Sequence, residues 1–192
     1  MPVGSLGLVF GASFAAGLNV YATVATLGLL QRFGVVTLPA PLQSLAHPLV
    51  LTIALLLYVV EFFADKIPVV DHVWDAIHTF VRPPAAAVLA YAAVAGVPEP
   101  WRLAAALLAG TVALASHGGK ATARVAVNAS PEPFSNWAVS VGEDALAISL
   151  AWLAASHPAL ALGLAIVLTV AAVWVVVLFF RLLRGMKRRV FG

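Results

Sequence analysis

The chain has 192 residues, of which 62% are hydrophobic and only 10% are charged. An average soluble domain is about 45–50% apolar and about 25% charged, so this composition excludes an ordinary soluble domain. The mean hydropathy of +1.02 agrees with that exclusion. Cysteine is absent, which excludes disulfides, thiolate catalysis and cysteine-based zinc sites. We therefore expect an all-α integral membrane protein built as a polytopic helical bundle.

Apolar stretches of about the length that a membrane helix needs recur along the chain. They predict about six membrane helices, at residues 5–31, 49–64, 84–97, 102–118, 137–155 and 159–180. The third stretch reaches only about 21 Å at 1.5 Å per residue, and the fifth contains Glu143 and Asp144. Both are therefore expected to be irregular. Residues 1–180 are predicted to form a single transmembrane domain and residues 181–192 a basic cytoplasmic tail.

Two polar segments interrupt this pattern, at residues 68–82 and 119–136. In the first, Asp71, Asp75, His78 and Arg82 follow helical spacing, and apolar residues occupy the other face. This pattern predicts an amphipathic helix that lies at the membrane interface with its polar face solvated. A segment that re-enters the membrane inside a protein cavity is the alternative.

The two polar segments also suggest an internal duplication. Shifting the chain by 54 residues places Lys66 on Lys120 and Phe80 on Phe134. The same shift lays the second and third predicted helices on the fourth and fifth. The shared order of helix, lysine, polar segment and helix is typical of repeats in transporters.

The distribution of basic residues predicts the topology, because cytoplasmic loops carry an excess of Lys and Arg. With six spans and the basic tail inside, only Arg32 and Arg102 of the eleven bases face outward. We therefore expect a multi-pass protein of the cell inner membrane with both termini in the cytoplasm. A re-entrant segment at 68–97 would instead change the side on which everything upstream lies.

Ionisable groups inside membrane segments are costly and mark functional sites by default. We predict that the substrate-binding residues are Asn19, Lys66, Lys120, Arg124, Asn128 and Asn136. Carboxylates removed from water take up protons more readily, so the predicted proton- or ion-coupling residues are Glu61, Asp65, Glu143 and Asp144. The alternative for these charged residues is a set of structural ion pairs, with lysine and arginine side chains reaching to the interface. Asn19 has a matching alternative, a hydrogen bond to a neighbouring helix.

Other classes of function have little support in the sequence. The chain contains no G-x-S-x-G, H-E-x-x-H or P-loop pattern, so we expect no enzyme. We also expect no metal site and no cofactor. We expect no nucleic-acid partner, because the bases form no patch interleaved with aromatic residues. The expected partners are membrane lipids, with anionic lipid at the basic tail. The sequence leaves open whether the chain forms a homo-oligomer.

Four short runs resemble a family of small bacterial membrane proteins catalogued as a domain of unknown function, number 4126. The runs are GLNVY at 17–21, EFFADKIP at 61–68, HGGKATAR at 117–124 and SPEPFSN at 130–136. The resemblance covers nearly the whole chain and implies a compact multi-span protein. It implies no activity.

Two functions are consistent with these observations. The first is a transporter or lipid flippase-like protein, in which a polar cluster near the cytoplasmic side handles an anionic group or an ion. The second is a non-catalytic membrane scaffold or assembly factor, in which the same cluster is structural.

Overall fold

The computed structural model describes residues 3–128 and 133–191, with side chains at all of these positions except 68, 128, 133 and 186–191. Throughout these ranges the regular structure is helical. The elements in chain order are α1 (Val3–Leu18), α2 (Val20–Arg32), the 3₁₀ helix η1 (Ala40–Ala46), α3 (Pro48–Ala64), α4 (Pro68–Ala93), α5 (Glu99–Asn128), α6 (Pro133–Ser156) and α7 (Pro158–Phe191). The all-α expectation is confirmed for the described residues.

The first apolar stretch forms a helical hairpin, not a single span. Asn19 has extended backbone angles (φ −153°, ψ 103°), and its side chain accepts a hydrogen bond from the Ala22 amide at the start of α2. From there α2 runs back beside α1, and Leu27 of α2 lines the same small cavity as Leu8 and Val9 of α1. The prediction of one span over residues 5–31 is therefore wrong. An asparagine that caps a new helix interrupts the apolar run.

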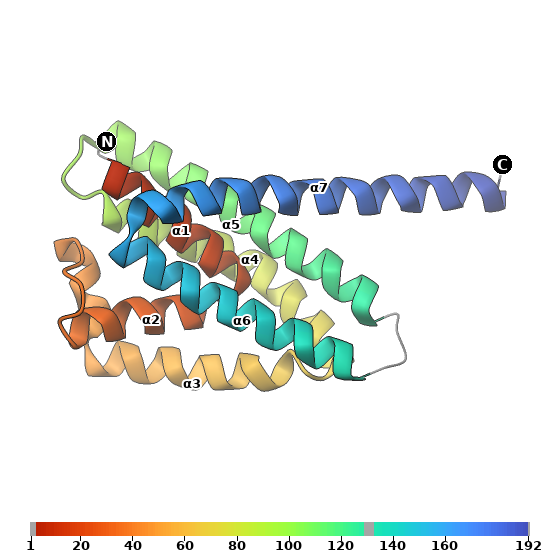
Figure 1. The fold of residues 1–192 in the computed structure, drawn as a ribbon, viewed down its shortest axis with the longest axis horizontal. Coiled ribbons are helices and arrows are strands. Elements are labelled where there is room, and N and C mark those ends of the chain that lie inside the picture. Colours follow the sequence, from red (N-terminus) through yellow and green to blue (C-terminus); the bar gives the residue numbers. More distant parts are fainter. Residues whose placement is uncertain (1–2, 129–132, 192) are drawn as a thin grey trace.

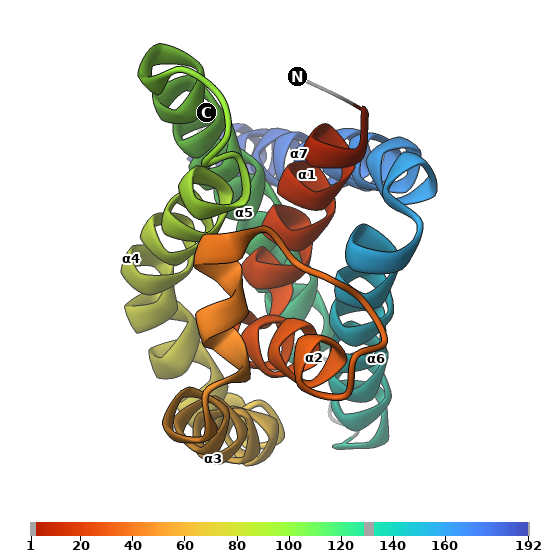
Figure 2. The ribbon, with the colours of Figure 1, turned by 90° about the vertical axis from the view of Figure 1, so that its left-hand side faces the viewer.

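α1 lies at the centre of the bundle and packs against α4, α5, α6 and α7 (Figure 2). Small residues allow this close packing. Ala15 and Ala16 are fully buried, and a Cβ added at Gly11 would lie 2.8 Å from the Cβ of Ala154 on α6. Close approach of helices at small residues is typical of membrane helix pairs.

α4 is one continuous helix that includes both the polar segment 68–82 and the predicted third span. Its polar stripe is buried, with Asp71 and Arg82 fully inaccessible to solvent. The apolar face is the exposed one, and Val69 and Phe80 are 77% and 81% exposed. The prediction of an interfacial helix with a solvated polar face is therefore wrong. A helix with its polar face inside and its apolar face outside suits a lipid environment.

The second predicted polar segment is not a separate element either. Residues 119–128 continue α5, residues 133–136 begin α6, and residues 129–132 lie outside the described residues. Lys120 is buried within α5, whereas Lys66 lies in the short connection between α3 and α4 and is half-buried. The two lysines do not occupy equivalent positions, so the structure does not support the alignment on which the duplication rests.

α7 extends well past the rest of the bundle (Figure 1). The predicted tail from residue 181 is a continuation of this helix through Phe191. The start of α1 and the end of α7 lie at opposite ends of the molecule (Figure 1). The hairpin explains why these two ends are apart. Because α2 runs back beside α1, the start of α1 and the end of α2 lie at the same end of the bundle.

Judged by length and composition, two described helices can cross a membrane, α6 over Phe134–Ser156 and α7 over Pro158–Gly185. A third candidate is the pair η1 and α3, which meet at an angle of 66°. α4 and α5 have 26 and 30 residues, which corresponds to about 39 Å and about 45 Å. They are long enough to cross a membrane but contain several charged residues.

Candidate functional site

Charged and amide side chains from α3, α4, α5 and α6 meet inside the bundle, beside the tip of the α1–α2 hairpin. We call this set the charge network. Its carboxylates are Glu61, Asp65, Asp71, Asp75, Glu143 and Asp144, its bases are Lys66, Arg82, Lys120 and Arg124, and its amides are Asn19 and Asn136. All of these residues are buried except Lys66 and Glu143, which are partly exposed.

Arg82 of α4 is a fully buried guanidinium that joins three helices. It donates to Glu61 of α3 at 2.6 Å and to Asp75, about two turns earlier on its own helix, at 3.4 Å. It also donates to the Gly17 carbonyl of α1 and to Nδ1 of His117 on α5. Because a guanidinium only donates, Nδ1 of His117 is the acceptor and the ring proton lies on Nε2, which faces the Asp75 carbonyl at 3.1 Å. His117 is therefore assigned as neutral.

Lys120 and Arg124 lie one turn apart on α5 and share acceptors. The Asp65 carboxylate accepts from Lys120 at 2.7 Å and from Arg124 at 3.2 Å. Arg124 also donates to Glu143 at 2.6 Å, to the amide oxygen of Asn136 at 2.8 Å and to the Asp65 carbonyl at 2.7 Å. That carbonyl lies at the end of α3, where helix carbonyls lack partners within the helix. The two bases thus connect α3, α5 and α6.

The break between α1 and α2 contributes directly to the network. At the C-terminal end of α1, where the helix dipole is negative, the Leu18 carbonyl accepts a hydrogen bond from Lys120 at 3.3 Å. Asn19 donates from Nδ2 to Asp144 of α6 at 2.9 Å, while its Oδ1 caps α2. A cation thus lies at the negative end of one half-helix, and a carboxylate lies near the positive end of the other.

Carboxylates outnumber bases in the charge network by six to four. Three carboxylate oxygens, Oε2 of Glu61, Oδ1 of Asp65 and Oδ2 of Asp144, are buried and have no hydrogen-bond donor among the described residues. A buried charge without a partner is strongly unfavourable. The two excess negative charges therefore call for protons or bound cations, and the network has acceptors for them.

Most of the predicted site residues do come together in this network. Eight of them lie in it with direct contacts: Asn19, Glu61, Asp65, Lys120, Arg124, Asn136, Glu143 and Asp144. Lys66 lies at its edge, where its ammonium group donates to the Phe62 carbonyl at 2.9 Å and to Ser140 at 3.4 Å. Asn128 lies in α5, but its side chain falls outside the described residues.

Sequence reasoning missed the contribution of α4, namely Asp71, Asp75 and Arg82. The spacing of these residues was detected but assigned to the wrong environment. The sequence carried no signal for this placement, because the periodicity is the same whether the polar face meets water or the protein interior.

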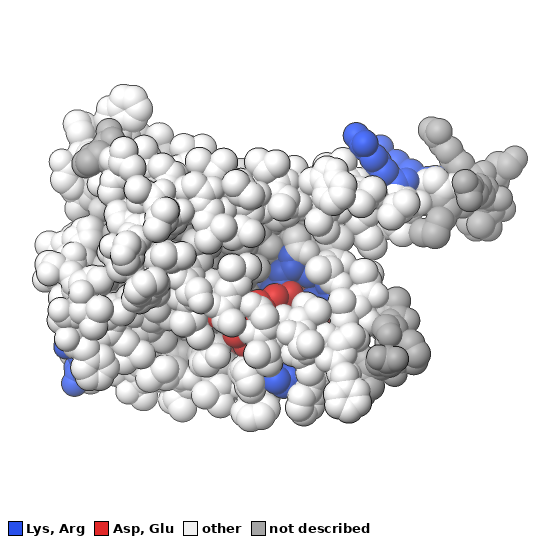
Figure 3. Space-filling model, viewed as in Figure 1, with Lys and Arg blue, Asp and Glu red and all other residues white. Residues whose placement is uncertain are grey.

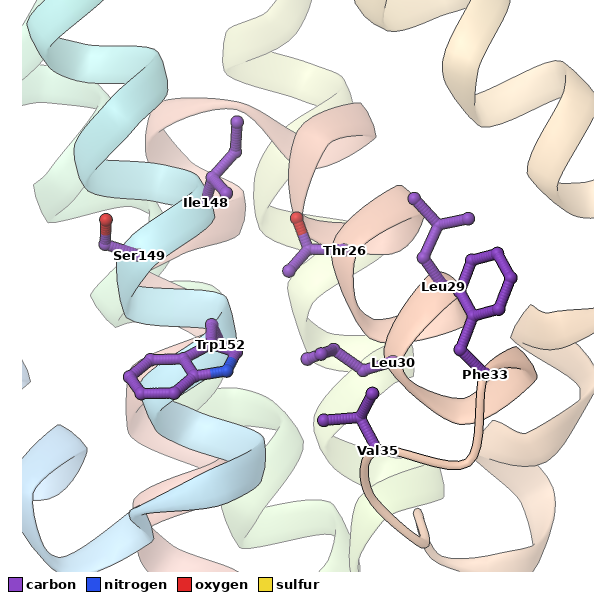
Figure 4. A pocket seen from close by; sticks show the side chains of 8 residues that line it. All are labelled: Thr26, Leu29, Leu30, Phe33, Val35, Ile148, Ser149 and Trp152. Atoms are coloured by element: carbon purple, nitrogen blue, oxygen red, sulfur yellow. The ribbon is translucent and has the colours of Figure 1, made fainter.

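A cavity with a volume of about 420 Å³ lies outside the charge network, between α2 and α6 (Figure 4). Leucine, isoleucine and aromatic side chains surround it, and its polar side chains are Thr26, Ser149 and the indole of Trp152. It contains no ionisable side chain. Apolar walls without a charged group do not point to ion chemistry, so this cavity is not the candidate site.

No group of three or more His, Asp or Glu residues is arranged to hold a metal ion in the part of the chain that the structure describes. The carboxylates are instead separated by the bases that they contact.

An apolar exterior around a buried charge network indicates a helical membrane protein. The exposed side chains include many large hydrophobic ones, and few charged atoms appear on the face that Figure 3 shows. The chain belongs to the family described as a domain of unknown function (DUF4126), whose model matches residues 6–177. No curated protein and no solved structure matches the chain.

Proposed function

We propose that the protein is a small membrane transporter that moves protons or small monovalent cations through the charge network. The observation that carries this proposal is the excess of buried carboxylates, with three unsatisfied oxygens on Glu61, Asp65 and Asp144. Ionisable residues in the interior of membrane bundles mark ion pathways and proton relays. A helix broken at the level of the site, as at Asn19, is a recurring feature of transporters.

The proposal includes an arrangement in the membrane. α3 to α7 cross the bilayer, and the α1–α2 hairpin enters and returns from one side, in place of six spans with both termini in the cytoplasm. The end of α7 carries Arg181 and Arg184, and the positive-inside rule places that end in the cytoplasm. The start of α1 then lies on the outer side, together with Arg32. Anionic lipid at the cytoplasmic end of α7 remains the expected contact of the tail.

The anion-binding role expected for Lys66, Lys120, Arg124 and Asn136 is not part of this proposal. Lys120 and Arg124 each contact two or more carboxylates. An anion would have to displace those carboxylates and leave their charges buried without a partner, at a cost of several kcal/mol. Headgroup phosphate is therefore a poorer candidate than a proton or a cation.

The test is an ion-flux assay with the full chain reconstituted in liposomes. A trapped pH-sensitive dye reports proton flux after an imposed pH gradient, and separate preparations report Na⁺ and K⁺. We expect the wild-type protein to dissipate at least one of these gradients. Asp144→Asn keeps the shape of the side chain but cannot lose a proton, so we expect it to slow the flux about tenfold or more.

Glu99→Gln is the matched control. Glu99 lies at the start of α5, is largely exposed and pairs with Arg102 outside the network. We expect its flux to equal that of wild type. Liposomes that stay tight to all three ions with wild-type protein would contradict the proposal.

A membrane scaffold is the second candidate, and the extensive pairing of Arg82, Lys120 and Arg124 favours it. In a scaffold the network only fixes the packing of α3, α4, α5 and α6. The scaffold hypothesis predicts that liposomes with the protein stay tight to ions. It also predicts a large loss of protein stability when a paired carboxylate is neutralised.

A further inference from the structure

A hollow of about 240 Å³ opens on the outside of the bundle between α5, α6 and α7. Its walls are apolar and include Leu146 of α6 and Leu168 and Val175 of α7. Lys120 and Glu143 of the charge network line its inner end. Figure 3 shows charged atoms of both signs at the bottom of a hollow below α7.

The polar group that this hollow exposes is a carboxylate. The Glu143 side chain is 13% exposed, whereas that of Lys120 is 0% exposed. Glu143 uses one oxygen, Oε2, for both hydrogen bonds from Arg124, at 2.6 Å and 3.0 Å. Its other oxygen, Oε1, has no hydrogen-bond donor among the described residues. The hollow therefore presents a carboxylate oxygen that has no donor among the described residues.

The position of the hollow determines how a ligand reaches it. Glu143 lies ten residues after the start of α6 at Pro133, which is about 15 Å along the helix. The flanking helices α6 and α7 are both candidate membrane spans. A ligand that enters between them comes from the hydrocarbon region and needs an apolar tail that suits the leucine and valine walls.

We infer that this hollow binds the headgroup of a membrane lipid that carries an ammonium group, with the ammonium on Oε1 of Glu143 and the acyl chain along α7. Charge complementarity carries the choice of ligand, because the network has an excess of two carboxylates, and the two bases near Glu143, Arg124 and Lys120, are buried and already bonded to carboxylates. A charge-assisted hydrogen bond in such a partly dry site is stronger than one in water. Binding here does not require that the protein transports anything.

The absence of cysteine from the chain gives a direct test. Ala171→Cys places an environment-sensitive fluorophore at the wall of the hollow, and Val170→Cys places the same probe on the opposite face of α7, where Val170 is 65% exposed. Each labelled protein, in maltoside micelles, is titrated with lysophosphatidylethanolamine and with lysophosphatidylglycerol of the same acyl chain. The two lipids share the phosphate and differ in the ammonium group.

We expect the ethanolamine lipid to act at about a tenfold lower concentration than the glycerol lipid at the Ala171 probe, and the Val170 probe to show no preference. Adding Glu143→Gln should reduce the preference to less than about twofold. Because loss of Glu143 disturbs Arg124, Leu168→Trp provides a second variant that fills the hollow and leaves the charged residues in place. It should abolish the response of the Ala171 probe to both lipids.

Equal potency of the two lipids at the Ala171 probe would overturn the inference, as would the same preference at the Val170 probe. A preference that survives both Glu143→Gln and Leu168→Trp would also overturn it. These outcomes are independent of the flux assay, so a protein that moves no ions can still bind the lipid here.

Discussion

Asp65 holds a central place among the residues of the charge network. Its carboxylate receives Lys120 and Arg124, and its carbonyl receives Arg124 and Asn136. Asp144 is attached much more loosely, through one hydrogen bond from Asn19. Two buried cations are thus paired with the negative charge of Asp65, whereas the hydrogen bond to Asp144 comes from a neutral amide.

This difference predicts unequal effects of the same substitution. Asp65→Asn removes the negative charge between two buried cations and should lower the free energy of unfolding by about 3–5 kcal/mol. Asp144→Asn keeps a hydrogen-bonding partner for Asn19 and removes an excess charge, so the change should be less than about 1 kcal/mol. Thermal unfolding in detergent, followed by circular dichroism, measures both. Equal losses would show that the network does not distinguish paired from excess carboxylates.

The residues of α5 and α6 in this network could be predicted from the sequence, because Glu143 and Asp144 interrupt a long apolar run where short side chains cannot reach water. The residues of α4 could not be placed in the same way. A helix with one polar and one apolar face has the same periodicity whether its polar face meets water or the protein interior. Only the surroundings of Asp75 and Arg82 decide between the two.

At the scale of the elements, the packing of α7 on α5 depends on Gly119, one of two adjacent glycines on α5. A Cβ added at Gly119 would lie 2.8 Å from the Cβ and 3.2 Å from the Cα of Ala172 on α7. A Cβ added at Gly118 would meet only a methyl group of Val176, at an ordinary 3.6 Å. The two positions share the same helix and differ in what faces them.

Gly119→Ala should therefore force α5 and α7 apart and lower the free energy of unfolding by about 1–3 kcal/mol. Gly118→Ala should leave it unchanged or raise it by up to about 1 kcal/mol, because alanine is the better helix former. Unfolding in detergent compares the two variants directly. A Gly118→Ala loss as large as that of Gly119→Ala would contradict the close contact at Ala172.

Hydropathy predicted the positions of α3, α6 and α7 well, since each is a long apolar run bounded by proline or glycine. It did not predict the α1–α2 hairpin. Residues 5–31 are apolar almost throughout, so nothing in hydropathy marks a reversal there. The reversal depends on Asn19, whose side chain caps α2 and bonds to Asp144 at the same time.

For the whole molecule, the hairpin decides which ends of the helices lie together. With α1–α2 as a hairpin, the start of α1 lies at the same end of the bundle as the connection that contains η1, and the end of α7 lies at the other end (Figure 1). With one straight span over residues 5–31, the start of the chain would instead share a side with the end of α7. The two arrangements place the start of α1 on different sides of the membrane.

Cysteine accessibility can separate these arrangements, because the natural chain has no cysteine. Val3→Cys, Ser44→Cys and Arg184→Cys each place a thiol at an exposed position near an end of the bundle. In sealed vesicles of one orientation, an impermeant maleimide should label Val3→Cys and Ser44→Cys from the same side and Arg184→Cys from the other. Labelling of all three after permeabilisation is the control for reactivity. Labelling of Val3→Cys from the side of Arg184→Cys would restore a straight first span, and Asn19 would then no longer lie at the tip of a hairpin beside Asp144.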